Sequence, residues 1–222
     1  MADRWATFDC YGTLVDWNAG ITRELARLFG PERAPRLLAR YHEIEPELEA
    51  GTHRTYREVL TGALARLAVD EGASISPGEE GALASSLPSW PVFPEVPRAL
   101  SEARRRGWRL AILSNSDRDL IAASEEQIGV PIDITVVAED VGSYKPAHGH
   151  WDRFYAESGA AKEAHVHVAA SLFHDIAPAR SLGLSCIWIN RLHERADPEP
   201  TRELTDLARL PDVLDQLVKE AL

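Results

Sequence analysis

Four short apolar runs in the second half of the chain constrain its fold more than any other feature. They span residues 108–113, 133–138, 165–170 and 184–190. Near-continuous apolar runs of this length are typical of parallel strands buried on both faces. The segments between them read as helices, and strands alternating with helices build a sheet covered on both sides. The second half of the chain therefore predicts an α/β domain with a parallel sheet.

The first half of the chain has a different character after one further apolar run at its start. Apolar residues there recur at helical spacing, and turn signals such as Gly30-Pro31 and Gly51-Thr52 separate the segments. We expect helices at residues 20–29, 34–50, 56–70 and 78–87. Antiparallel helices with apolar faces form small bundles.

Two boundaries follow from this change of character. Four prolines within residues 88–97 predict a stiff extended connector between the helices and the rest of the chain. The simplest arrangement is a Rossmann-like, parallel-sheet core made of residues 1–15 and 94–222. Residues 16–93 are then inserted after the first strand as a helical-bundle cap domain.

Composition and charge narrow the classes of partner. The chain has 222 residues, a formal net charge of −11 and no basic tract beyond residues 104–106, which makes nucleic acid an improbable partner. No stretch approaches the roughly 20 apolar residues that span a bilayer. The two cysteines, Cys10 and Cys186, lie in apolar runs, which favours free thiols over a disulfide. We therefore expect a cytoplasmic protein that binds neither nucleic acid nor membrane.

Asp9 is the first candidate for chemistry. It ends the apolar run at the start of the chain, and Gly12 breaks the pattern soon after it. The carboxyl end of a parallel strand is where open α/β sheets bind ligands, and a carboxylate there can act as a nucleophile. The alternative is that Asp9 only caps a turn, and this segment alone does not decide between the two.

Three further motifs follow Asp9 in order. They are ILSNS at residues 112–116, SYKP at 143–146 and LFHD at 172–175. With FDCYGTL at residues 8–14, this series resembles the haloacid dehalogenase (HAD) superfamily, whose members carry a nucleophilic Asp, then Ser or Thr, then Lys, then an acidic motif. The resemblance covers nearly the whole chain and implies an α/β core with a helical cap inserted after the first strand.

The position two residues after Asp9 separates chemistries within that superfamily. Phosphatases usually place a second Asp there as general acid and base, whereas this chain has Tyr11, whose unperturbed pKa near ~10 suits neither role at neutral pH. Asp-x-Tyr-Gly-Thr, together with WINR at residues 188–191, is similar to the type II L-2-haloacid dehalogenase branch. That resemblance implies a hydrolase acting on short 2-haloacids without a metal or cofactor, and it allows a homodimer.

The resemblance also assigns roles around Asp9. This carboxylate would attack C2 of the substrate, and water would then hydrolyse the aspartyl ester. Arg40 and Asn115 are expected to bind the departing halide, as a cation and an amide donor. Lys145 and Ser114 are expected to form the polar frame of Asp9, because a nearby ammonium favours an ionised carboxylate.

Weaker assignments complete the expected site. Thr13 can donate its hydroxyl at the first turn, and Tyr11 can pack over the substrate or order water. Arg40 could instead be an ordinary solvated arginine. Asn115 could instead cap the helix expected at residues 117–127.

Asp175 is the most ambiguous candidate. In dehalogenases the matching acid is expected to orient Lys145 and the hydrolytic water. Their Ser-x-Asn-x-x-Asp pattern is not kept, because Ala170 and Leu172 stand at its Ser and Asn positions, and Ser171 could substitute only if the loop shifts by one residue.

Two alternatives therefore stay open. One is a Mg²⁺-dependent small-molecule phosphatase, in which Asp9 and Asp175 would be metal ligands. The other is a catalytically weak HAD-fold binding protein.

The histidines predict no metal site. His165 and His167 alternate along an expected strand, so both side chains lie on one face, but no Cys or carboxylate completes a zinc pattern. His174, next to Asp175, is expected to border the site.

Overall fold

One parallel sheet organises the molecule. The computed structural model describes residues 3–50 and 54–221 and contains a six-stranded sheet with the order β3-β2-β1-β4-β5-β6. Every neighbouring pair is parallel, as the apolar runs predicted. The strands are β1 (Arg4–Phe8), β2 (Trp108–Ser114), β3 (Ile134–Val137), β4 (His165–Ala169), β5 (Ser185–Ile189) and β6 (Arg202–Leu204).

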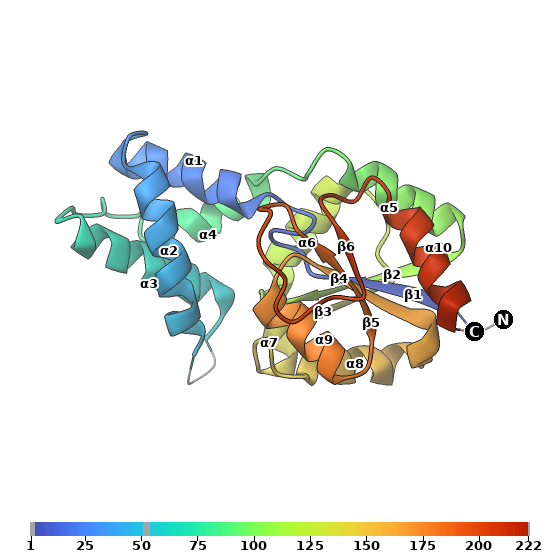
Figure 1. Cartoon of the computed structure of the whole chain (residues 1–222). Helices are drawn as coiled ribbons and strands as arrows, with labels where there is room; N and C mark the ends of the chain where they lie inside the picture. The colour runs from blue at the N-terminus through green and yellow to red at the C-terminus, as the bar shows by residue number, and fades with distance from the viewer. Residues whose placement is uncertain (1–2, 51–53, 222) are drawn as a thin grey trace.

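Helices cover both faces of the sheet (Figure 1). Side chains on alternate strand positions point to opposite faces. Ala6 and Phe8 of β1 accordingly join one apolar cluster, whereas Trp5 joins the other. On the first face lie α5 (Val96–Arg105), α6 (Arg118–Ile128) and α10 (Leu210–Ala221), and on the second lie α7 (Ala138–Val141), α8 (Gly149–Ser158) and α9 (Ala177–Ser181).

The remaining helices form a separate layer beyond one end of the sheet, to the left in Figure 1. They are α1 (Trp17–Phe29), α2 (Ala34–Glu49), α3 (Tyr56–Asp70) and α4 (Ala82–Ser86), all inserted between β1 and β2. The α/β core with an inserted helical bundle confirms the predicted fold class. It also places the bundle over the carboxyl ends of the central strands, where ligands bind in sheets of this kind.

The chain passes between the two layers twice, and both passages lie side by side. Asp16 N donates to Pro91 O at 2.7 Å, and Phe93 N donates to Leu14 O at 3.0 Å. Val15 and Val92 form an isolated antiparallel bridge between these hydrogen bonds. The outgoing and returning segments are therefore held together.

Helix boundaries follow the capping residues more closely than the apolar pattern. The third helix matches its predicted bounds, because Thr55 and Glu58 form a reciprocal capping box at its start. The first helix begins at Trp17, earlier than predicted, because Asp16 Oδ1 accepts a hydrogen bond from Ala19 N.

Two expectations were wrong in detail, and one strand had not been expected. The helix expected at 78–87 is helical only from Ala82, and residues 87–89 form a 3₁₀ turn. The extended connector ends sooner than expected, because α5 begins at Val96 and the first turn of a helix tolerates Pro97. Strand β6, with only three residues, was not expected. The turn at Gly51-Thr52 lies outside the described residues.

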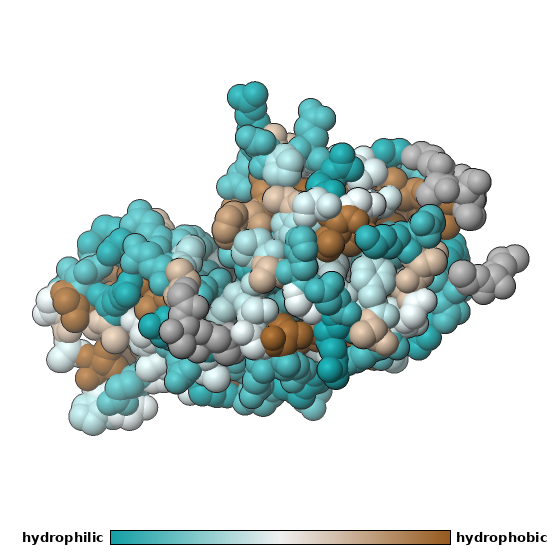
Figure 2. All heavy atoms as spheres, turned by 90° about the horizontal axis from the view of Figure 1, so that it is seen from below, coloured by the Kyte–Doolittle hydropathy of each residue, from teal (hydrophilic) through white to brown (hydrophobic). Residues whose placement is uncertain are grey.

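Among the described residues, the large apolar side chains that are exposed are Val69, Phe173 and Leu192. In the view of Figure 2 the apolar residues form small separate patches among hydrophilic ones. Across residues 3–50 and 54–221, no helix has the length and apolar character needed to cross a bilayer. Cys10 and Cys186 are buried free thiols, as predicted.

Candidate active site

A cavity of about 240 Å³ lies between the carboxyl ends of the central strands and the inserted helices. Most of the polar side chains predicted from the motifs meet in it. Its lining comprises Asp9, Tyr11, Trp17, His42, Glu45, Pro46, Glu49, Tyr56, Ser114, Asn115, Lys145, Ser171, His174 and Asp175.

The turn after β1 fixes the carboxylate of Asp9. Asp9 N donates to Val168 O of β4 at 3.1 Å, and Asp9 Oδ2 accepts the hydroxyl of Thr13 at 2.8 Å. Thr13 Oγ1 in turn accepts from Ala170 N at 2.9 Å. Gly12 allows this tight return because its φ is +89°, a conformation that side chains rarely adopt. The Asp9 carboxylate is thereby aimed at the cavity while its backbone stays in the sheet.

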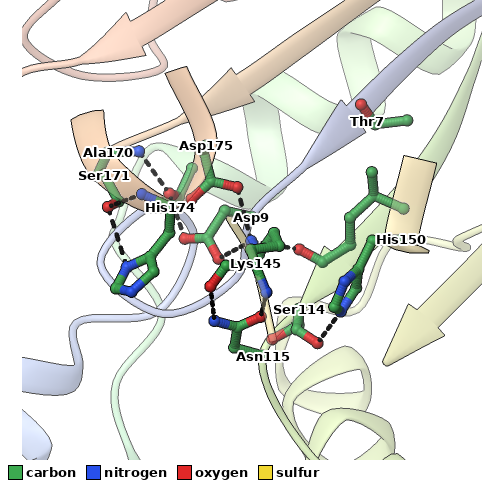
Figure 3. Close-up of polar contacts among 12 residues, drawn as sticks. Thr7, Asp9, Ser114, Asn115, Lys145, His150, Ala170, Ser171, His174 and Asp175 are labelled. Atoms are coloured by element: carbon green, nitrogen blue, oxygen red, sulfur yellow. Dashed lines mark hydrogen bonds and ion pairs between the residues drawn. The ribbon is translucent and has the colours of Figure 1, made fainter. Parts of the chain in front are cut away.

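Lys145 joins the two buried carboxylates (Figure 3). Its Nζ donates to Asp9 Oδ1 at 3.0 Å, to Asp175 Oδ1 at 2.6 Å and to Leu113 O at 2.8 Å. The side chain is 1% exposed. Each of its three N–H groups therefore binds a protein oxygen instead of water. Burial lowers the pKa of Lys145, but Asp175 and Asp9 outweigh it and raise that pKa above its ordinary value.

The two carboxylates differ in the direction in which their pKa values are shifted. Burial is the largest influence on Asp9 and raises its pKa, although Lys145 opposes it. Burial also acts to raise the pKa of Asp175, but Lys145 and His167 together bring that pKa below its ordinary value. Asp175 is therefore the firmly ionised partner of Lys145, and Asp9 is the more basic carboxylate.

Two polar atoms in the cavity wall lack partners. Ser114 Oγ and Asp175 Oδ2 are both buried, and neither has a hydrogen-bond partner among the described residues. An unsatisfied buried polar atom is costly, which is why such atoms are usually paired. The residues that carry these two atoms both line the cavity.

The side-chain amide of Asn115 forms two hydrogen bonds with the backbone of Lys145. Its Oδ1 accepts from Lys145 N at 2.6 Å, and its Nδ2 donates to Lys145 O at 3.1 Å. This pair of bonds fixes the loop that carries the lysine. It leaves the second N–H of the Asn115 amide free to meet a ligand. Asn115 does not cap the following helix, whose N-cap position belongs to Asp117.

Tyr11 presents a ring to the cavity and its hydroxyl to the protein. The ring stacks on Tyr56 with centroids 6.0 Å apart, and the hydroxyl lies 3.2 Å from Ser124 Oγ. Burial raises the pKa of Tyr11 well above its ordinary value, so the phenol stays neutral. Tyr11 is thus an apolar wall in the position where phosphatases carry their second acid.

Arg40 does not line the cavity, contrary to the expectation that it lies at the site and binds the departing halide. Its side chain is 42% exposed and pairs with Asp70 and Glu43, each at 2.8 Å. The residues of α2 that do face the cavity are His42, Glu45, Pro46 and Glu49. Their spacing follows one helical stripe, and Arg40 lies off that stripe.

Sequence reasoning missed the acidic residues that α2 contributes. Glu45 Oε1 accepts the hydroxyls of Tyr41 and Tyr56 at 2.8 and 3.0 Å, and burial raises the pKa of Glu45 to about 7. Burial, with Glu45 next in importance, raises the pKa of Glu49 to about 9. Helical spacing from His42 could have revealed both residues.

His174 borders the cavity, as predicted. Its backbone N donates to Ser171 Oγ at 3.0 Å, and its Nε2 lies 3.6 Å from Glu49 Oε2. Burial lowers the pKa of His174. Ser171 itself lines the cavity, so a hydroxyl does reach the region where Ala170 and Leu172 replace polar groups.

An ammonium, that of Lys145, joins the two carboxylates that would be the Mg²⁺ ligands of a phosphatase. Within residues 3–50 and 54–221, no three His, Cys, Asp or Glu side chains are grouped so that they could hold a metal. The facing oxygens of Asp9 and Asp175 both bind the Lys145 ammonium, which repels a second cation placed beside it. Magnesium also needs near-octahedral oxygen coordination.

Comparisons with known proteins agree with this geometry. At 27% identity the chain resembles the (S)-2-haloacid dehalogenase of Pseudomonas sp. (strain YL), over 96% of this chain and 95% of that enzyme. At 30% identity it resembles the phosphoserine phosphatase of Thermus thermophilus, but over only 60% of this chain and 53% of that enzyme. A structure of L-2-haloacid dehalogenase from Xanthobacter autotrophicus superposes with a TM-score of 0.86 at 18% identity, over 96% of this chain and 98% of that one.

The dehalogenase similarities run the length of both chains, which supports the type II branch that the motifs predicted. A family model described as haloacid dehalogenase-like hydrolase matches residues 4–183, most of the chain. This protein therefore belongs to the haloacid dehalogenase-like hydrolases.

Proposed function

We propose that this hydrolase cleaves the carbon–halogen bond of short 2-haloacids through an ester formed on Asp9. The observation that carries the proposal is the pairing of Asp9 with Lys145 in a cavity that Tyr11 also lines. A phosphatase needs an acid at that position, whereas displacement of halide needs an apolar surface and a carboxylate. The full-length similarity to an enzyme named (S)-2-haloacid dehalogenase supports the same choice.

The first step is displacement at carbon. An oxygen of Asp9 donates a lone pair to C2 of the substrate, and the carbon–halogen electron pair leaves with the halide. Thr13 and Lys145 hold the two carboxylate oxygens, so the nucleophile meets the carbon in one orientation. Because only this step touches C2, the product alcohol has the inverted configuration.

The departing halide needs hydrogen-bond donors, and the core supplies them. The second N–H of Asn115 and the unpartnered Ser114 Oγ both belong to the cavity wall. These donors replace the guanidinium expected from Arg40. Neutral donors aimed at a developing anion lower the barrier without needing to move during the reaction.

The second step is hydrolysis of the ester. Water adds to the carboxyl carbon of Asp9, and the carbonyl oxygen that becomes negative is stabilised by Lys145. Asp175 Oδ2, free of protein partners, accepts a hydrogen bond from that water and takes its proton. On collapse of the intermediate the bond between the acyl carbon and the alkyl oxygen breaks, and that oxygen takes the proton held by Asp175. The other proton of the water is lost to solvent, so the Asp9 carboxylate returns and the 2-hydroxy acid leaves, with no metal or cofactor in either step.

The proposal also covers the domain boundaries, the cellular location and the oligomeric state of the enzyme. We place the core at residues 1–15 and 94–222 and the cap at 16–93, and we infer a cytoplasmic homodimer whose substrate is a small organic acid. Sedimentation velocity of the purified protein measures the oligomeric state directly.

The test of the function is halide release from L- and D-2-haloacids in the presence of EDTA. Release from one enantiomer under chelation supports metal-free displacement, and Asp9→Asn should abolish even a single turnover. Asp152→Asn, on the exposed first turn of α8, is the matched control and should release halide normally. Undiminished release by Asp9→Asn would contradict the proposal.

A second candidate, a phosphatase, rests on the partial similarity to phosphoserine phosphatase. Release of phosphate from small phosphomonoesters that depends on added Mg²⁺ supports it. Tight binding of a small acid without any turnover would instead identify a binding protein.

A further inference from the structure

A chain of hydrogen bonds runs through the core from α8 to the active site. Tyr155 Oη lies 2.7 Å from His165 Nδ1, and His165 Nε2 lies 2.7 Å from Thr7 Oγ1. Thr7 Oγ1 lies 2.8 Å from His167 Nδ1, and His167 Nε2 lies 3.1 Å from Asp175 Oδ1. The sheet builds this path, because Thr7 of β1 is paired in register with His167 of β4.

The residues of this hydrogen-bond chain are buried among apolar groups. Thr7, His165 and His167 are each at most 1% exposed. The ring of Trp151 packs 5.2 Å from His167, and that of Phe154 packs 4.8 Å from His165, both from α8. Polar groups in such surroundings are stable only when each one is satisfied, and here all four imidazole nitrogens have a partner.

The carboxylate of Asp175, at one end of the hydrogen-bond chain, fixes which atom donates in each hydrogen bond. Asp175 can only accept, so His167 donates from Nε2, and a neutral imidazole then accepts at Nδ1. Thr7 must therefore donate to His167, and its oxygen accepts from His165 Nε2. His165 Nδ1 is left to accept the hydroxyl of Tyr155. Every proton points towards Asp175.

His165 fits this neutral arrangement. Burial, with His167 next in importance, lowers the pKa of His165 to about 3. The charged groups nearest to His167 along the chain are Asp175 and, bound to it, Lys145. His150, on the neighbouring helix, also has a lowered pKa, mainly through burial and then through Lys145.

We propose that His167 is a positioning residue, whose Nε2–H, oriented by the hydroxyl of Thr7, holds Asp175 Oδ1 so that Oδ2 faces the hydrolytic water. Lys145 and His167 share Oδ1, so the carboxylate cannot rotate without losing both bonds. The inference rests on the proposed function, because it concerns the second step, hydrolysis of the Asp9 ester.

Two pairs of variants test the role. Thr7→Val keeps the shape but removes the donor to His167, and Thr7→Ser restores it. His167→Leu removes the donor to Asp175, and His167→Gln offers an amide N–H in its place. Thr135→Val makes the same change on β3, outside the hydrogen-bond chain, and is the control for loss of a strand hydroxyl.

Kinetics separate positioning from stability. In Thr7→Val and His167→Leu, ester hydrolysis should slow by about tenfold or more, as happens when the partner behind a reacting group is lost. The first burst of halide should persist, and mass spectrometry should detect the ester accumulating on Asp9. Thr7→Ser, His167→Gln and Thr135→Val should turn over without that accumulation. Equal slowing of both steps in Thr7→Val and His167→Leu would overturn the proposal.

A spectroscopic arm is independent of turnover. In ¹⁵N-histidine spectra of the wild-type protein at neutral pH, His165 and His167 should both be neutral and carry their proton on Nε2. A proton on Nδ1 of His167, or a charged ring, would overturn the positioning role even if halide release is normal. Failure of the proposed function gives a different pattern, since the expected tautomers would then appear in a protein that releases no halide.

Discussion

The carboxylate of Asp117, in the α/β core, receives the first two backbone N–H groups of the cap helix α3. Tyr56 N donates to Asp117 Oδ1 at 2.8 Å, and Arg57 N donates to Oδ2 at 2.9 Å. The first N–H groups of a helix have no partner inside it, and a carboxylate also suits the positive end of the helix dipole. A core residue thus caps a helix that lies far away in sequence and carries a wall of the cavity.

Asp117→Ala should therefore weaken the contact between core and cap. We expect a loss of about 1–2 kcal/mol in the free energy of unfolding, as for other lost helix caps, measured by urea denaturation. The KM for substrate should also rise, because Tyr56 belongs to the cavity wall. Asp119→Ala is the matched control: Asp119 pairs with Arg57 on the surface, where ion pairs contribute little. Equal effects of the two variants would show that Asp117 is only a surface partner.

Lys145→Met should leave two buried carboxylates without their cation. Removing one partner of a buried ion pair typically costs about 3–5 kcal/mol, and activity should be lost with it. Without the ammonium, both carboxylates have pKa values above those of the unfolded chain. The folded variant then binds protons more tightly, so its stability should increase as the pH falls from 8 to 5. Urea denaturation at both pH values measures this, and a variant whose stability falls in that range would contradict the assignment.

Glu45 and Glu49 should make the protein less stable as the pH rises, whereas carboxylates with lowered pKa values make a protein less stable as the pH falls. Their pKa values are raised by burial to about 7 and about 9, above the unfolded value. Their contribution to stability is complete below the unfolded pKa and is lost as pH rises through the folded values. Glu45→Gln should therefore stabilise the protein by about 1–3 kcal/mol at pH 8 and have little effect at pH 4. Thermal unfolding at the two pH values compares them, with exposed Glu43→Gln as control.

Arg40→Ala should leave halide release within about twofold of the wild-type rate, because the guanidinium pairs with Asp70 and Glu43 outside the cavity. Asn115→Ala and Ser114→Ala should each lower kcat by about tenfold or more, since they remove donors from the cavity. Steady-state rates on the preferred haloacid measure all three. A large loss in Arg40→Ala alone would restore the halide role expected from the family.

The sequence predicts the sheet and the meeting of Asp9, Ser114, Lys145 and Asp175 well. Each of these residues follows or ends an apolar run, and the ends of parallel strands converge at one edge of the sheet. Strand β6 could not be predicted, because its three residues are not buried and carry no apolar pattern.

The face that a helix presents was harder to predict. Arg40 was matched by its position along the chain, whereas the rotation of α2 is set by the burial of Leu37, Tyr41 and Ile44. That rotation turns Glu45 and Glu49 inwards and Arg40 outwards. The partners of Asp117 and Thr7 depend on packing between distant segments, which no local pattern records.

The paired passages at Leu14–Asp16 and Pro91–Phe93 both connect the core to the cap, and hydrogen bonds hold them side by side. Opening of the cap for substrate entry can therefore follow a single swing. Such a swing changes backbone angles in only a few residues and leaves the sheet that carries Asp9 and Lys145 intact. In such a swing the nucleophile and its cation would stay assembled, and the wall residues on α1, α2 and α3 would move.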